Sequence, residues 1–287
     1  MIDAVEALPT IPGLMMALLL TTATVCGVLA LTVVGERVIR TIVNDRQKKR
    51  RDRVRPVLLD IIDGNTSFAF SRADTRALTR LAAHTATQVR GDDRAALTTW
   101  LVTQQFHREC LAHMKSPFAL TRARALDRFA PLAELAPVSV ERMLTDRDAR
   151  VRSLAAQVIG RAGLSSLVPA LLRSAEGSRD IPARIVSMAV LRAAPSTIAD
   201  FGDTPSDSSV RVRAMALDLA GQLNLVDARR VIEAGLSSPS EVVRLASIRS
   251  LQRLGSPLSL PALQAMATYS AYEHSHAQIA IYELQAE

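Results

Sequence analysis

The sequence predicts an all-α protein, in which one transmembrane helix precedes a solenoid of about five to six helical pairs. Residues 14–34 form an uncharged apolar run, and a Val-Arg motif recurs at intervals of about 31 residues later in the chain. Aromatic residues make up only 3% of a chain that is 48% hydrophobic. The core must therefore be built from Leu, Val, Ile and Ala, which suit stacked helices.

These patterns divide the chain into five predicted segments. They are a short extracytoplasmic N-terminus (1–13), a transmembrane helix (14–35), a basic juxtamembrane segment (36–55), a helical N-terminal cap (56–91) and a helical-repeat array (92–287). The cap is predicted because apolar runs with helical character stand on both sides of the turn-like sequence Asp63-Gly64-Asn65.

The run from Leu14 to Val34 contains no charged residue. As an α-helix it would span about 30 Å, the thickness of the hydrocarbon layer of a membrane. A buried core helix rarely has so long an apolar stretch. A cleaved signal peptide needs a basic start and a small-residue cleavage site, whereas this segment begins with Asp3 and Glu6 and continues into Glu36. The sequence therefore predicts a membrane anchor.

Charge asymmetry predicts how the anchor is oriented. Nine Lys and Arg residues lie between positions 37 and 55, and none precedes the apolar run. By the positive-inside rule the N-terminus lies outside and the array lies in the cytoplasm. The Arg- and Ala-rich composition is typical of a GC-rich bacterial genome, so we expect the plasma (inner) membrane of a bacterium. Cys26 and Cys110 then form no disulfide.

Two parts of the anchor region have alternative interpretations. The basic segment either contacts anionic lipid headgroups or only sets the topology; the candidate contacts are Lys48, Lys49, Arg50 and Arg51. Ala23, Gly27 and Ala30 share one face of the predicted membrane helix. Such small residues allow a second helix to approach closely, but they are also common in helices that act as plain anchors.

The array is predicted from arginines that open runs of small and aliphatic residues at helical spacing. They are Arg122, Arg152, Arg184, Arg213 and Arg244. Residues that favour helix N-caps stand shortly before four of them, namely Asp148, Asp180, Ser209 and Ser240. Shorter amphipathic segments lie between these helices, at about 131–144, 165–176, 195–203, 225–236 and 258–271. Because neither helix of such a pair can bury its apolar face alone, the pairs must stack.

The Val-Arg pair that opens the second helix resembles the HEAT repeat, including its short bacterial variety. An Asp six residues before Arg152 and before Arg213, at positions 146 and 207, completes the motif, whereas Ser stands at positions 178 and 238. The resemblance is good for residues 117–256 and weaker on both sides. It implies that the arginines bridge neighbouring repeats through carboxylates and loop carbonyls.

With its anchor and basic segment, the chain resembles bacterial membrane-anchored HEAT proteins, some of which are associated with membrane glycosyltransferases. This resemblance implies a scaffold or regulatory adaptor whose partner is a protein, itself membrane-associated. The outward face of the second helices is the expected binding surface. Its residues are Arg150, Gln157, Arg161, Arg211, Asp218, Leu245, Arg249 and Arg253. Mixed charge on this face suits a protein better than a phosphate backbone.

The alternative function is nucleic-acid binding, which some HEAT proteins perform in a basic groove. The excess of positive charge lies mainly in the juxtamembrane segment, and the chain has one Trp, three Tyr and six Phe for base stacking, so nucleic acid is the less favoured partner.

Catalytic chemistry finds little support in the sequence. His107, Cys110 and His113 could be metal ligands, but on a helix they spread over about 120° and cannot all face one ion. The sequence carries no phosphate-binding loop and none of the common nucleophile or zinc motifs. We therefore expect no enzymatic activity, no cofactor, no metal and no small-molecule substrate.

Overall fold

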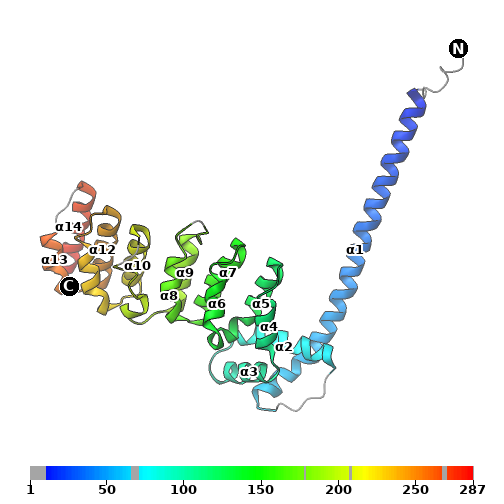
Figure 1. The fold of residues 1–287 in the computed structure, drawn as a ribbon, viewed down its shortest axis with the longest axis horizontal. Helices are drawn as coiled ribbons and strands as arrows, with labels where there is room; N and C mark the ends of the chain where they lie inside the picture. The colour runs from blue at the N-terminus through cyan, green and yellow to red at the C-terminus, as the bar shows by residue number, and fades with distance from the viewer. Residues whose placement is uncertain (1–10, 66–70, 178, 207–208, 267–269, 287) are drawn as a thin grey trace. The chain divides into compact units, whose positions relative to one another are not determined.

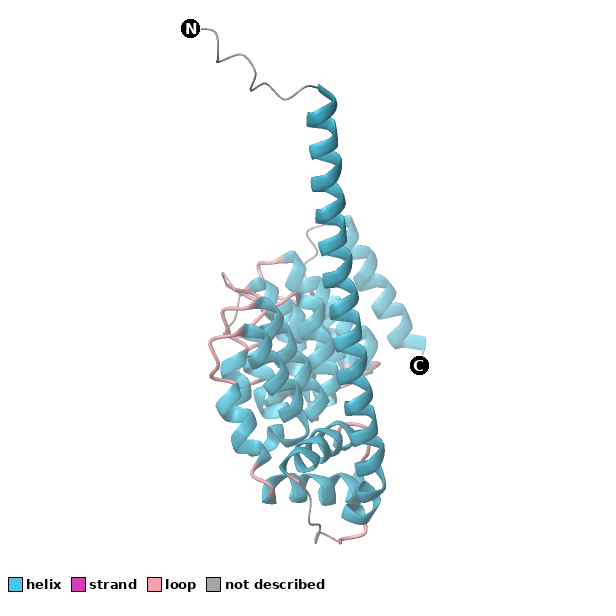
Figure 2. Ribbon diagram, turned by 90° about the vertical axis from the view of Figure 1, so that its right-hand side faces the viewer, coloured by secondary structure: helices cyan, strands magenta, loops and turns pink. Residues whose placement is uncertain are grey.

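The computed structural model describes residues 11–65, 71–177, 179–206, 209–266 and 270–286. All secondary structure in these ranges is helical (Figures 1 and 2), as the composition predicts. The chain forms two compact units, Met1–Leu81 and Ala82–Glu287.

The first unit is dominated by helix α1 (Ile11–Ile62), which is 52 residues long and continues through Pro56. Its side chains from Leu18 to Thr32 are exposed, whereas Val54, Leu58 and Ile61 near its end are buried. Helix α2 (Arg72–Ala86) follows. Among the helices as far as the structure describes them, none combines the length and apolar character that a membrane crossing requires.

Parts of the predicted anchor region lie outside the described residues. The first ten residues of the predicted extracytoplasmic segment are among them. Helix α1 passes through Lys48, Lys49, Arg50 and Arg51, but the side chains of these residues are not among those described. The small residues Ala23, Gly27 and Ala30 are described, and all three are exposed.

The second unit opens with α3 (Gly91–Thr103) and α4 (Phe106–His113), after which the second helices of successive pairs lie side by side (Figure 1). In the described part of the chain these second helices are α5 (Ala119–Phe129), α7 (Ala149–Ala162), α9 (Ala183–Ala193), α10 (Val210–Gln222), α12 (Glu241–Leu254) and α14 (Ala271–Ala286). Their Leu, Val, Ile and Ala side chains form the core, with Ile159 and Leu251 fully buried.

Four of the first helices are short and follow a 3-10 turn. They are α6 (Pro137–Met143) after η1 (Ala130–Leu135), α8 (Val168–Arg173) after η2 (Ser165–Leu167), α11 (Arg229–Gly235) after η4 (Val226–Ala228), and α13 (Leu260–Ala265) after η5 (Pro257–Ser259). Between α9 and α10 the described chain forms only the turn η3 (Ile198–Phe201). Helices α9 and α10 accordingly share far fewer contacts than α7 and α9.

Local sequence explains where the second helices begin and end. Asp148 caps α7, because its carboxylate accepts hydrogen bonds from the N–H groups of Arg150 and Val151 at 2.9 and 3.4 Å. Gly163 ends α7 with a φ of 70°, a conformation that glycine adopts without strain. Ser240 holds the predicted N-cap position of α12, but its side chain makes no capping hydrogen bond.

Two glycines set how neighbouring second helices pack. A Cβ on Gly160 of α7 would lie 2.9 Å from the Cα of Ala189 in α9. A Cβ on Gly221 of α10 would lie 2.6 Å from the Cα of Ser250 in α12. The two contacts are equivalent, and both leave no space for a side chain. Ala189 and Ser250 therefore hold the same position in their helices.

This equivalence corrects the predicted register of α9 by one residue. Ser250 follows Arg244 by six residues, so the counterpart of Arg244 in α9 is Ala183, six residues before Ala189. The prediction that Arg184 holds this position is wrong. Asp180 is not the N-cap either, because α9 begins directly after Pro182. Arg184 is instead exposed on the surface.

Candidate functional site

Two buried arginines of the second helices, Arg122 and Arg244, connect neighbouring repeats. Arg122 donates from Nε and Nη2 to the two carboxylate oxygens of Asp146, at 2.8 and 2.7 Å. Its Nη1 donates to the carbonyl oxygens of Ser116 and Pro117, both at 3.0 Å. Both charged side chains are 6% exposed. The guanidinium thus holds its own loop and the loop of the next repeat together.

Arg244 repeats this arrangement near the C-terminal end. Its Nη1 donates to the carbonyls of Ser238 and Pro239 at 2.8 and 3.0 Å, and its Nε donates to Glu273 at 3.0 Å. The bridging role implied by the HEAT resemblance is therefore confirmed for Arg122 and Arg244. Since these groups are buried and engaged, they form the framework of the array rather than a surface for a ligand.

The pKa of Asp146 reflects this framework role. Burial raises its pKa, but the hydrogen bonds from Arg122 and from the N–H of Asp148, with the charges of Arg122 and Arg147, bring it below the usual value. Asp146 is consequently ionised at neutral pH.

The outer face, defined here as the exposed surface of the second helices, carries a separate series of ion pairs. Asp127 of α5 pairs with Arg161 of α7 at 3.0 Å, and Asp218 of α10 pairs with Arg253 of α12 at 2.6 Å. In each pair an acid from one helix meets an arginine 34 or 35 residues later. The outer face therefore neutralises much of its own charge.

In the middle of the array, α7 and α9 lack the Asp that forms these ion pairs elsewhere. Gln157 of α7 and Met188 of α9 hold the positions that Asp127 and Asp218 hold in their helices. Arg192 lies 35 residues after Gln157, where the series places the arginine of a pair. Arg192 forms no ion pair with any described carboxylate, and neither do Arg150 and Arg184.

A groove lies over this part of the outer face. It consists of two adjoining hollows of about 490 and 360 Å³ that share Gln157. We call it the α7–α9 groove; its other lining residues are Ala123, Ala149, Arg150, Ser153, Leu154, Arg184, Ile185, Met188, Ala189 and Arg192. Met188 is 48% exposed, so the groove includes an apolar side chain that faces solvent. The groove thus combines an apolar centre with three exposed arginines.

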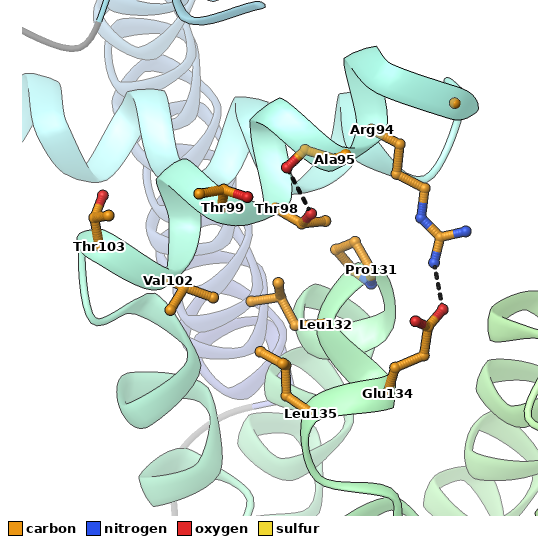
Figure 3. Close-up of a pocket in the computed structure, with 11 residues that line it drawn as sticks. Arg94, Ala95, Thr98, Thr99, Val102, Thr103, Pro131, Leu132, Glu134 and Leu135 are labelled. Atoms are coloured by element: carbon orange, nitrogen blue, oxygen red, sulfur yellow. Dashed lines mark hydrogen bonds and ion pairs between the residues drawn. The ribbon is translucent and has the colours of Figure 1, made fainter. Parts of the chain in front are cut away.

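A separate pocket, of about 580 Å³, lies between α3 and the turn η1 (Figure 3). The side chains of Val102, Leu132 and Leu135 gather in it, and the ion pair between Arg94 and Glu134, at 3.2 Å, lies at one end. Its threonines include Thr98 and Thr103, whose hydroxyls donate to carbonyls of their own helix. Because these donors are already used, the pocket offers mainly apolar contact.

The eight residues predicted for partner binding are all exposed or half-buried. Arg150 and Gln157 line the α7–α9 groove, and Leu245 is half-buried. The others have partners within the array: Arg161 with Asp127, Asp218 with Arg253, Arg211 with Asp180 at 3.9 Å, and Arg249 with the hydroxyl of Tyr272 at 3.1 Å.

The sequence analysis missed the α9 side of the groove, which comprises Arg184, Met188 and Arg192. Assigning Arg184 to the buried arginine position took this helix out of the predicted surface. Aligning the helices on Ala183 gives positions 122, 152, 183, 213 and 244, which are separated by 30, 31, 30 and 31 residues. This more even period was a signal for the correct register.

Cys110 is buried, and burial, with the nearby charge of Glu109, raises the pKa of its thiol to about 12, so the thiol stays protonated. No group of three His, Cys, Asp or Glu side chains with metal-binding geometry occurs within the described ranges.

Comparison with known proteins bears on the array. The family model for HEAT repeats matches residues 203–281, from before α10 into α14. Comparison with curated proteins gave no match. The chain is similar to the crystal structure of an engineered protein, with 16% identity and a TM-score of 0.31, over 80% of this chain and 96% of that one. It is similar to human deoxyhypusine hydroxylase in complex with glycerol, with 16% identity, a TM-score of 0.29, and coverage of 84% and 98%. The family match supports repeats of the HEAT type.

Proposed function

We propose that this chain is a membrane-tethered scaffold or regulatory adaptor that presents its helical-repeat array to a protein partner in the bacterial cytoplasm. The observation that carries the proposal is the α7–α9 groove, which combines an exposed Met188 with three exposed arginines that form no ion pair with any described carboxylate. Helical-repeat arrays commonly use such extended surfaces for binding. By the family resemblance, the partner is a membrane-protein complex such as a glycosyltransferase.

The tether is supported by α1 and its sequence. The helix is continuous from Ile11 to Ile62, and it exposes large apolar side chains between Met16 and Val34. Such a surface is unfavourable in water and favourable in lipid. The nine basic residues after it favour a cytoplasmic array, and they lie where anionic headgroups attract cations at about 1 kcal/mol each.

Orientation has a direct test. A reporter that is active only in the cytoplasm should give signal when fused after Glu287 and none when fused before Met1. The opposite pattern would reverse the proposed topology.

Affinity purification of the full chain from its own membranes in mild detergent tests the scaffold function. We expect a partner that is retained when residues 14–35 are exchanged for an unrelated membrane helix, and that is lost when the chain is truncated after Ile62. Equal recovery with the truncated chain would show that the array does not bind the partner, and the scaffold proposal would fail.

A further inference from the structure

We infer that the α7–α9 groove binds an acidic segment of the partner protein, one that places an apolar side chain against Met188 and carboxylates against Arg184 and Arg192. This inference rests on the proposed scaffold function and gives the chemistry of the partner. Both hollows of the groove belong to the same compact unit and share Gln157, so one short segment can contact α7 and α9 together.

Equivalent positions in neighbouring helices differ in charge. Asp127 and Asp218 neutralise arginines of the following helix, at 3.0 and 2.6 Å. At the equivalent place Gln157 cannot neutralise Arg192, because an amide carries no charge. Arg192 and Arg184 each carry a cationic guanidinium that only donates hydrogen bonds. A carboxylate from outside the chain would complete the pair that this repeat lacks.

Met188 provides the apolar part of the groove. Its counterparts Asp127 and Asp218 are charged and suited to water, whereas Met188 exposes 48% of its surface beside the half-buried Ile185. Methionine is flexible and polarisable, and it is over-used on surfaces that bind other proteins. Covering it with an apolar side chain is favourable, since apolar area is removed from water. The segment therefore needs an apolar residue between its carboxylates.

The same arginines could attract phosphate, so nucleic acid is the competing ligand. The described residues that line the groove include no Phe, Tyr, Trp or His on which a base could stack. An apolar centre such as Met188 also offers nothing to a sugar-phosphate backbone. Arginine binds a carboxylate with two parallel hydrogen bonds, as Arg122 does with Asp146 in this protein. These observations favour an acidic peptide.

A photoreactive amino acid at position 188 of the full chain, irradiated in its own membranes, tests this inference. Mass spectrometry of the captured peptide should show an apolar residue with at least two Asp or Glu residues within about one helical turn on either side. A synthetic peptide of that sequence should bind the purified full chain, and exchange of its acids for Lys should weaken binding roughly tenfold or more.

Gln157→Asp is the decisive variant. By the spacing of the other pairs, the new carboxylate should neutralise Arg192 within the array, so the fold is kept while one of the two binding charges is removed. We expect photocapture at position 188 to fall roughly tenfold in this variant. The matched control is Gln278→Asp, which makes the same exchange on an exposed position of α14 and should leave capture unchanged.

Several outcomes would overturn the inference. A neutral or basic captured peptide would do so, and so would a nucleic-acid or lipid adduct, or full capture by Gln157→Asp. A second photoreactive position, at the half-buried Leu245 of α12, separates the two proposals. Capture of protein at position 245 without capture at position 188 would leave the scaffold function standing and refute the groove. If no protein is captured at position 188 or at position 245, the scaffold function and the groove inference are both refuted.

Discussion

Replacing Asp146 by Ala should destabilise the array strongly. The change removes the carboxylate that accepts two hydrogen bonds from Arg122, at 2.8 and 2.7 Å, where both side chains are 6% exposed. A guanidinium then stays buried with two of its four hydrogen bonds lost. Removal of one partner of a buried ion pair costs about 3–5 kcal/mol. For a domain of this size, that loss lowers the midpoint of thermal unfolding by roughly 6–20 °C.

Circular dichroism at 222 nm, on the purified full chain in mild detergent, measures this midpoint. Asp127→Ala is the matched control, because it breaks an exposed pair with Arg161 whose side chains are 59% and 37% exposed; such pairs contribute about 0–1 kcal/mol. Replacing both partners of the buried pair, as Arg122→Met with Asp146→Leu, should recover most of the loss. A single variant as stable as the control, or a double variant no better than the single one, would refute the reasoning.

The pH dependence of stability gives an independent check on the same pair. The pKa of Asp146 is lowered in the folded state, chiefly because Arg122 and the N–H of Asp148 donate to it against the opposing effect of burial. Its contribution is therefore fully present above the ordinary pKa of Asp, about 3.9, and is lost as the pH falls through the lower folded value. The stability difference between the wild type and Asp146→Asn should shrink below about pH 4. A constant difference down to pH 2 would contradict the assigned direction.

Other predictions concern packing, reactivity and the anchor. Ile159→Asp should abolish cooperative unfolding by circular dichroism, because it buries an unpaired charge at a fully buried site. Gly160→Ala should lower the thermal midpoint despite its better helix propensity, since its Cβ would lie 2.7 Å from a backbone oxygen of α9. Cys110 should resist alkylation at pH 8 until the chain unfolds. Mass spectrometry of the peptide that contains Cys110 measures the extent of alkylation. Gly27→Leu, like Leu18→Ala, should leave recovery of the partner by affinity purification unchanged when the helix is a plain anchor, whereas loss with Gly27→Leu alone would show that the small-residue face packs against a membrane helix.

The period and the helix ends could be predicted because they depend on local chemistry. Asp148 and Gly163 define α7 through capping and a left-handed turn. The register of α9 depends instead on a long-range contact between Gly160 and Ala189. A match of residue type at Arg184 could not reveal it, because one exposed arginine and one buried arginine look alike in the sequence.

The α7 side of the candidate site could be predicted from the sequence, whereas the ion pairs between helices could not. Helical spacing placed Arg150 and Gln157 on the outer face, since exposure follows the apolar pattern of their own helix. Whether an exposed charge is free depends on the neighbouring helix, about 35 residues away. The pairs of Arg161 and Arg253 were therefore not foreseen, and neither was the finding that no described carboxylate pairs with Arg192.

The short turn η3 has a consequence for how the array unfolds. In repeat proteins, stability is the sum of each repeat's own stability and of its interfaces with its neighbours. At the junction of α9 and α10 the first helix is reduced to Ile198–Phe201, and Ala183 replaces the bridging arginine. Cooperativity is weakest there, so denaturant should melt the array as two blocks rather than one. The block that carries α7 and α9 can stay folded while the repeats after it open, and amide exchange should be fastest at this junction.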